Sequence, residues 1–182
     1  MNGSSRWGTG RILLLLGRLG LAVIFLVAAY GKLRPQNAAS WTLSSLKITP
    51  ASLGLSMTFF AFEVDSYHML PEWGANLVAR TLPWAELALV ILLLAGIGLR
   101  YVAAVTTLLL TALLAVVIRA YALHLVINCG CFGPNEKLDG WTLARDGSFV
   151  ALGLAVTIGA FIIDRRNRLA ASALSRTELP AS

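Results

Sequence analysis

The chain has 182 residues, of which 57% are hydrophobic and 13% are charged, and its formal net charge at pH 7 is +6. A soluble domain has about 25% charged residues, so this composition excludes an intrinsically disordered chain and argues against an ordinary soluble domain. The apolar residues gather in four runs, each about as long as a helix that crosses a hydrocarbon core of about 30 Å. Because lipid offers the backbone no hydrogen-bond partner, we expect all four runs to be helices.

The predicted fold is therefore an all-α membrane protein, a four-helix transmembrane bundle with spans at about 12–30, 82–99, 102–125 and 147–163. Arg18 interrupts the first span, and we expect its long side chain to reach the nearby membrane surface. Val27-Ala28-Ala29 also resembles a signal-peptide cleavage site, which is an alternative interpretation of this segment. The chain 1–182 is predicted to be a single membrane domain with two loops on one side, at 31–81 and 126–146.

The positive charge is distributed unevenly across the predicted membrane. If the N-terminus is cytoplasmic, that side holds eight arginines against two acidic residues, a net charge of +6. The two loops on the other side hold six basic and six acidic residues and sum to zero. This asymmetry follows the positive-inside rule, so we predict that both termini are cytoplasmic and that the protein is a multi-pass protein of the inner (plasma) membrane. The basic excess then reflects topology and lipid contact, and no nucleic-acid partner is predicted.

The first loop contains an apolar segment, Leu53–Phe62, that is too short to cross the membrane. We expect it to lie on the membrane surface or to cover the outer end of the bundle.

The second loop contains the only two cysteines of the chain, Cys129 and Cys131, in the string Cys129-Gly130-Cys131-Phe132-Gly133. A disulfide requires Cα atoms about 4.4–6.8 Å apart, whereas two extended residues span about 6.6–7.2 Å, so the backbone must bend at Gly130. So small a ring is strained and easily reduced, and it stabilises a fold little. The spacing therefore favours thiol–disulfide exchange, with an inert local disulfide, free thiols or metal ligands as alternatives.

A zinc site is the main alternative for the two cysteines. The chain has only two histidines, His68 and His124, so a Cys2His2 site is arithmetically allowed. Nothing in the spacing supports such a site, and no metal is predicted. His124, near the cysteine loop, is interpreted as a polar side chain at the membrane interface or as a proton carrier.

Two opposite charges lie inside the predicted spans, Glu86 in the second and Arg119 in the third. Both lie about four to six residues, or about 6–9 Å, below the outer surface. Because unpaired charges at depth are costly, we expect the two to form an ion pair. The alternative is a polar floor beneath the cysteine loop that relays protons or holds a polar head group.

Three groups of motifs carry a resemblance to a known family. They are Phe25–Pro35, Leu82-Pro83-Trp84-Ala85-Glu86-Leu87, and the cysteine string followed by Gly140-Trp141 and Arg145-Asp146. In this order they resemble the MauE/DoxX group of redox-associated four-helix membrane proteins, and most closely the methylamine-utilisation (MauE) family.

The resemblance implies a membrane partner of extracytoplasmic thioredoxin-like proteins, associated with maturation of the disulfide-rich small subunit of methylamine dehydrogenase. It also implies that Cys129 and Cys131 are the redox pair, and it marks Lys32, Glu86 and Arg145 as pattern positions without a defined role. Residues 36–66 look like an insertion relative to the family, which allows a different partner or a place in a larger membrane complex.

The functional hypothesis is a membrane-embedded thiol–disulfide redox protein whose Cys-Gly-Cys pair faces the extracytoplasmic side. One pair alone cannot carry electrons across a membrane, so a quinone or a second protein must recharge it, although no residue specifies a quinone site. Two alternatives are a structural or assembly subunit, and a carrier of a quinone or another small molecule that uses Glu86 and Arg119.

Overall fold

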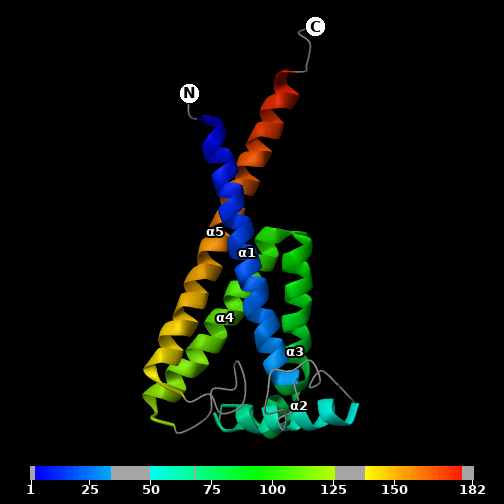
Figure 1. Ribbon diagram of the computed structural model, residues 1–182, viewed down its shortest axis with the longest axis vertical. Helices are drawn as coiled ribbons and strands as arrows, with labels where there is room; N and C mark the ends of the chain where they lie inside the picture. The colour runs from blue at the N-terminus through cyan, green and yellow to red at the C-terminus, as the bar shows by residue number, and fades with distance from the viewer. Residues whose placement is uncertain (1–2, 34–49, 68, 126–137, 178–182) are drawn as a thin grey trace.

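The computed structural model describes residues 3–33, 50–67, 69–125 and 138–177, and within these ranges the regular structure is entirely α-helical (Figure 1). The helices are α1 (Gly3–Leu33), α2 (Pro50–Asp65), α3 (Glu72–Ala95), α4 (Leu99–Ala122) and α5 (Gly140–Thr177).

Four of these helices are long and apolar enough to cross a membrane, which confirms the predicted four-helix membrane fold. Their apolar spans are Gly10–Leu33, Glu72–Ala95, Leu99–Ala122 and Gly140–Ala170. The predicted start of the second span was wrong, because α3 begins at Glu72 and continues through Pro83 without ending. A proline inside a helix removes one backbone hydrogen bond, and burial of this proline among neighbouring helices offsets that cost.

The helices pack in pairs, with α1 along α3 and α5, and α4 along α5. The core between them is apolar and includes Leu21, Phe25, Val90, Leu93 and Val156. Large apolar side chains also point outward from every span, as expected for a surface that faces lipid.

Small residues let the spans approach closely. A methyl group added at Gly153 of α5 would lie 2.8 Å from the Thr107 hydroxyl of α4, and that hydroxyl is 3.0 Å from the hydroxyl of Thr157. Gly17 of α1 lies against Val156 of α5 in the same way. Close backbone approach at small residues is how membrane helices gain packing energy.

A tight turn joins α3 to α4, with Gly96 and Gly98 both in the left-handed region at φ values of +70° and +57°. Arg18 of α1 is half-buried, and its Nη2 donates a hydrogen bond to the Leu94 carbonyl at 3.4 Å. A cation at the end of a helix satisfies carbonyls that have no helical donor. Arg18 therefore contacts the C-terminal end of α3. From the sequence we predicted only that its side chain reaches the nearby membrane surface.

The helix α2 lies across one end of the bundle, here called the α2 end, and both chain termini lie at the opposite end, here called the terminal end (Figure 1). Its inward face buries Ser56 and Phe60, whereas Leu55 and Phe62 remain exposed on its outer face. Because α2 packs on α3 and α1, the apolar segment predicted in the first loop covers the end of the bundle. At the terminal end, Arg100 of α4 pairs with Asp164 of α5 at 2.6 Å.

Candidate functional site at the α2 end of the bundle

A buried ion pair joins α1 to α3 near the α2 end. Lys32 Nζ donates to Glu86 Oε1 at 2.7 Å, and the two side chains are 4% and 1% exposed. Lys32 occupies the last turn of α1, where the helix dipole favours a cation. Its ammonium also lies 5.5 Å from the centre of the Phe60 ring of α2, within the range of a cation–π contact.

The predicted partner of Glu86 was therefore wrong, because Glu86 pairs with Lys32 and not with Arg119. Arg119 lies in the last turn of α4 and is exposed. The helix ends at Ala122, three residues earlier than predicted, so Arg119 lies close to the helix end and can reach polar surroundings. The predicted equal depth was also wrong, because Glu86 lies fourteen residues after the start of α3 and Arg119 lies three residues before the end of α4. Opposite sign alone does not show which way each helix face points.

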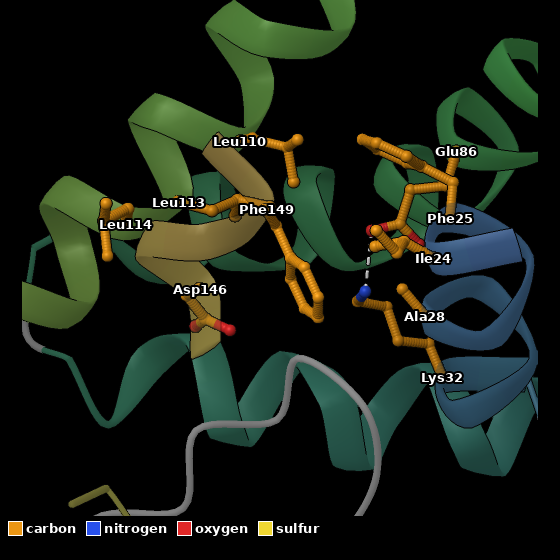
Figure 2. A pocket seen from close by; sticks show the side chains of 10 residues that line it. All are labelled: Ile24, Phe25, Ala28, Lys32, Glu86, Leu110, Leu113, Leu114, Asp146 and Phe149. Atoms are coloured by element: carbon orange, nitrogen blue, oxygen red, sulfur yellow. Dashed lines mark hydrogen bonds and ion pairs between the residues drawn. The ribbon is translucent and has the colours of Figure 1, made fainter. Parts of the chain in front are cut away.

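A small cavity of about 30 Å³ borders the ion pair, and Phe149 of α5 points into it between the pair and the leucines of α4 (Figure 2). Glu86 Oε2 is buried and accepts no hydrogen bond from the described residues. A cavity of this volume has room for a water molecule. The second oxygen of Glu86 thus lies beside a space where it can be hydrated.

Asp146 lines the same cavity from α5, one turn before Phe149 (Figure 2). Arg145 Nη2 pairs with Asp146 Oδ1 at 2.9 Å, and the Arg145 guanidinium lies 5.9 Å from the centre of the Phe149 ring. The N-terminus of α5 is capped by Asp139, whose Oδ1 accepts from the Thr142 amide at 2.8 Å. These contacts are all local to the start of α5 and order its first turns.

A larger cavity of about 300 Å³ lies between α2, α3 and α4, with Lys32 of α1 also in its wall. Among the described residues its walls are mainly apolar, and the polar side chains that line it are Lys32, Glu63 and Tyr67. Glu63 belongs to α2, outside the membrane spans, and burial raises its pKa from 4.5 to about 6 against the opposing effect of the Lys32 charge. Lys32 and Leu113 line both cavities.

Two of the remaining predicted site residues lie within the described part of the chain. His124 is exposed just after α4, at a φ of +52°, and Arg145 lies at the start of α5. Cys129, Gly130, Cys131, Phe132 and Gly133 lie outside the described residues, as does His68. Among the described residues, no three His, Cys, Asp or Glu side chains come together as a metal site.

Sequence reasoning missed two parts of this site, the Lys32–Glu86 pairing and the role of Glu63. The pairing had a signal, because Lys32 continues the stripe of Leu21, Phe25 and Ala28 on one face of α1. A residue on such a stripe faces the bundle. Glu63 had a weaker signal, since it follows directly after the apolar segment that was expected to cover the bundle.

The fold and the buried ion pair define a multi-pass membrane protein with four spans and a helical cover at one end. A family model described as methylamine utilisation protein MauE matches residues 10–159, which is most of the chain. The chain therefore belongs to the MauE family, as its motifs had indicated. No curated protein and no solved structure matches it.

Proposed function

We propose that this protein is a membrane-embedded thiol–disulfide redox protein that uses Cys129 and Cys131 on the extracytoplasmic side. The observation that carries the proposal is that the only two cysteines of a MauE-family chain are one residue apart. The segment that holds them joins α4 to α5, and α4 ends and α5 begins at the α2 end of the bundle (Figure 1).

The proposed reaction is reversible exchange with a dithiol protein. A thiolate of the partner attacks one sulfur of the Cys129–Cys131 disulfide, the S–S bond breaks, and a mixed disulfide forms with one thiolate leaving. The partner's second thiolate then attacks the mixed disulfide and releases the second cysteine. Two electrons pass from the partner to the cysteine pair, and two protons follow to the thiolates that are left.

The proposed topology places both termini in the cytoplasm and the α2 end outside. Four spans put both termini on one side of a membrane, and the charge asymmetry of the sequence favours the cytoplasm for them. The partner is then an extracytoplasmic protein with a thioredoxin-like fold. The family is described as a methylamine utilisation protein, which supports a partner in that process, and we propose an amine dehydrogenase subunit as the final recipient of the disulfides.

The first experiment measures the side and the redox state of the cysteines. A membrane-impermeant maleimide is applied to intact cells that carry the wild type, with and without prior reduction. Two reporters in a Cys129→Ser/Cys131→Ser background serve as controls, Glu72→Cys at the start of α3 and Asn167→Cys near the end of α5. We expect labelling of the native cysteines and of Glu72→Cys, with Asn167→Cys labelled only after permeabilisation. The reverse pattern would overturn the topology.

The second experiment measures the reduction potential of the pair in glutathione buffers and traps mixed disulfides with Cys129→Ser and Cys131→Ser. A redox-active pair has a potential above about −300 mV, whereas inert structural disulfides lie below it. We expect one single-cysteine variant to accumulate an adduct with a thioredoxin-like protein, and the double variant to form none. A potential below this limit, with no adduct from either variant, would favour a structural or assembly subunit.

A further inference from the structure

The 300 Å³ cavity at the α2 end has the size and composition of a ligand site. Its volume lies at the lower limit of small-molecule pockets, so it holds one ring or head group and not a whole lipid. Val78, Leu82, Leu113 and Val116 form apolar walls from α3 and α4. Apolar walls with a few converging polar groups are the usual composition of a small-molecule site.

The charges around the cavity restrict the kind of head group. Lys32 carries one positive charge, Glu86 beside it carries one negative charge, and Glu63 adds a second negative charge when ionised. Burial places the pKa of Glu63 at about 6, so at pH 7 its carboxylate form predominates. Among the described residues that line the cavity, the one cation, Lys32, is already paired with Glu86, and the acidic Glu63 faces the same space, which opposes carboxylate and phosphate head groups. An uncharged polar head on an apolar molecule fits these walls and charges.

The proposed function adds one further requirement. A single cysteine pair that has accepted two electrons must pass them on before it can react again, and a membrane-soluble two-electron acceptor meets that requirement. Quinones are uncharged and apolar, and they carry carbonyl oxygens on a ring.

We propose that the cavity between α2, α3 and α4 binds the ring of a membrane quinone, with Lys32 and Glu63 as its polar contacts. This inference rests on the proposed function for its physiological meaning, but binding itself does not require the cysteines. An ammonium donates to a quinone carbonyl, and a carboxylate accepts from a hydroquinone hydroxyl. The same two side chains therefore suit both oxidation states of the ligand.

In the recharging step, the quinone reoxidises the reduced cysteine pair. Two cysteine thiols become one disulfide and release two electrons and two protons, and the quinone takes up both pairs to become the hydroquinone. Glu63 is the group in the cavity that can exchange one of these protons, because its pKa lies close to neutral pH.

The test uses the full-length protein in lipid nanodiscs and a photoreactive azido-benzoquinone with a short alkyl chain. We expect saturable labelling that decyl-benzoquinone displaces and oleate does not. Peptide mass spectrometry should place the label on cavity residues such as Tyr67 and Met69. Label elsewhere, or equal displacement by oleate, would overturn the proposal even if every variant failed to fold.

Matched variants sharpen the test. Val116→Phe places a larger side chain in the cavity wall and should reduce labelling about tenfold, which corresponds to a loss of about 1.4 kcal/mol of binding free energy. Val105→Phe makes the same change on the exposed face of α4, where the residue is 53% exposed, and should leave labelling unchanged. Equal labelling of the two variants would contradict the assigned site.

Two further variants separate this inference from the proposed function. Glu63→Gln should keep benzoquinone labelling and weaken competition by the hydroquinone, since a charged acceptor is lost. Unchanged competition would remove Glu63 from the proposal. Cys129→Ser/Cys131→Ser should bind the probe as the wild type does. Normal binding with redox-inert cysteines would refute the function alone, whereas absent binding with active cysteines would refute the quinone site alone.

Discussion

Removing one partner of the Lys32–Glu86 pair should destabilise the protein far more than removing both. The two atoms are 2.7 Å apart, and their side chains are 4% and 1% exposed. Breaking a buried ion pair costs about 3–5 kcal/mol because one charge stays buried alone, whereas replacing the whole pair by apolar residues is often neutral. We therefore expect large effects from Lys32→Met and from Glu86→Leu, and a small effect from the double variant.

The relative cost of the two single variants depends on how the charge that stays buried is accommodated, and neutralising that charge is one way. At pH 7, a lysine with its ordinary pKa of about 10.4 loses its proton for about 5 kcal/mol. A glutamate with its ordinary pKa of about 4.3 gains one for about 4 kcal/mol. These costs are upper limits and differ by only about 1 kcal/mol, and Lys32 in the last turn of α1 can also move its ammonium toward the interface. We therefore expect the two single variants to be comparably damaging.

The assay is reversible unfolding of the purified protein in mixed detergent micelles, arranged as a double-mutant cycle. The control is Arg100→Gln, which breaks the partly exposed Arg100–Asp164 pair and should cost less than about 1 kcal/mol. If either single variant at the buried pair cost no more than this control, or if the double variant cost the sum of the singles, the reasoning would be refuted.

Three further predictions concern Glu63, the α4–α5 contact and the cap of α5. Since burial raises the pKa of Glu63 from 4.5 to about 6, the folded state holds the proton more tightly, and stability should fall as pH rises through this window. Glu63→Gln should flatten that profile and add about 1 kcal/mol at pH 7, a value discounted for partial exposure and checked by pH-dependent unfolding. Gly153→Ala should lower the free energy of unfolding by about 1–3 kcal/mol, because it forces a methyl group against α4. The control Gly147→Ala, which has open space around it, should not lower that free energy. Equal unfolding free energies of the two variants would contradict the close contact. Asp139→Ala should speed amide hydrogen exchange in the first turn of α5 and Asp139→Asn should not, because asparagine also caps helices.

The sequence was sufficient to predict the spans, because lipid forces helices and composition reveals their length. It placed the start of α3 ten residues too late, at Leu82, because the segment after Glu72 contains Asn76 and Arg80, which look like loop residues. Those side chains are exposed, while Ala75 and Ala79, which directly precede them in the chain, are buried. Polar residues on one face of the first turns of a helix lower the mean hydropathy of those turns, although the helix continues through them.

The site was harder to predict, because an ion pair depends on how each helix is rotated about its axis. Glu86 continues the buried stripe of Ala75, Ala79 and Pro83 on α3, the face that meets α1. Charge is readable from the sequence, whereas the depth of a charge depends on where its helix begins and the facing of two helices depends on their packing. The large cavity was not predictable for the same reason, since its walls come from separate helices.

The ion pair also has a consequence for how the chain enters the membrane during synthesis. Lys32 and Glu86 are 54 residues apart, so at about 5–20 residues per second Lys32 is synthesised about 3–11 s before Glu86. Lys32 lies in the last turn of its helix, and a lysine there can keep its ammonium at the membrane interface until Glu86 is inserted. Glu86 lies fourteen residues after the start of its helix, and its short side chain cannot bring the carboxylate to the interface. The first span therefore has to be in place before the second can insert at low cost, and the order of the two charges along the chain makes the N-terminal helix the template for the bundle.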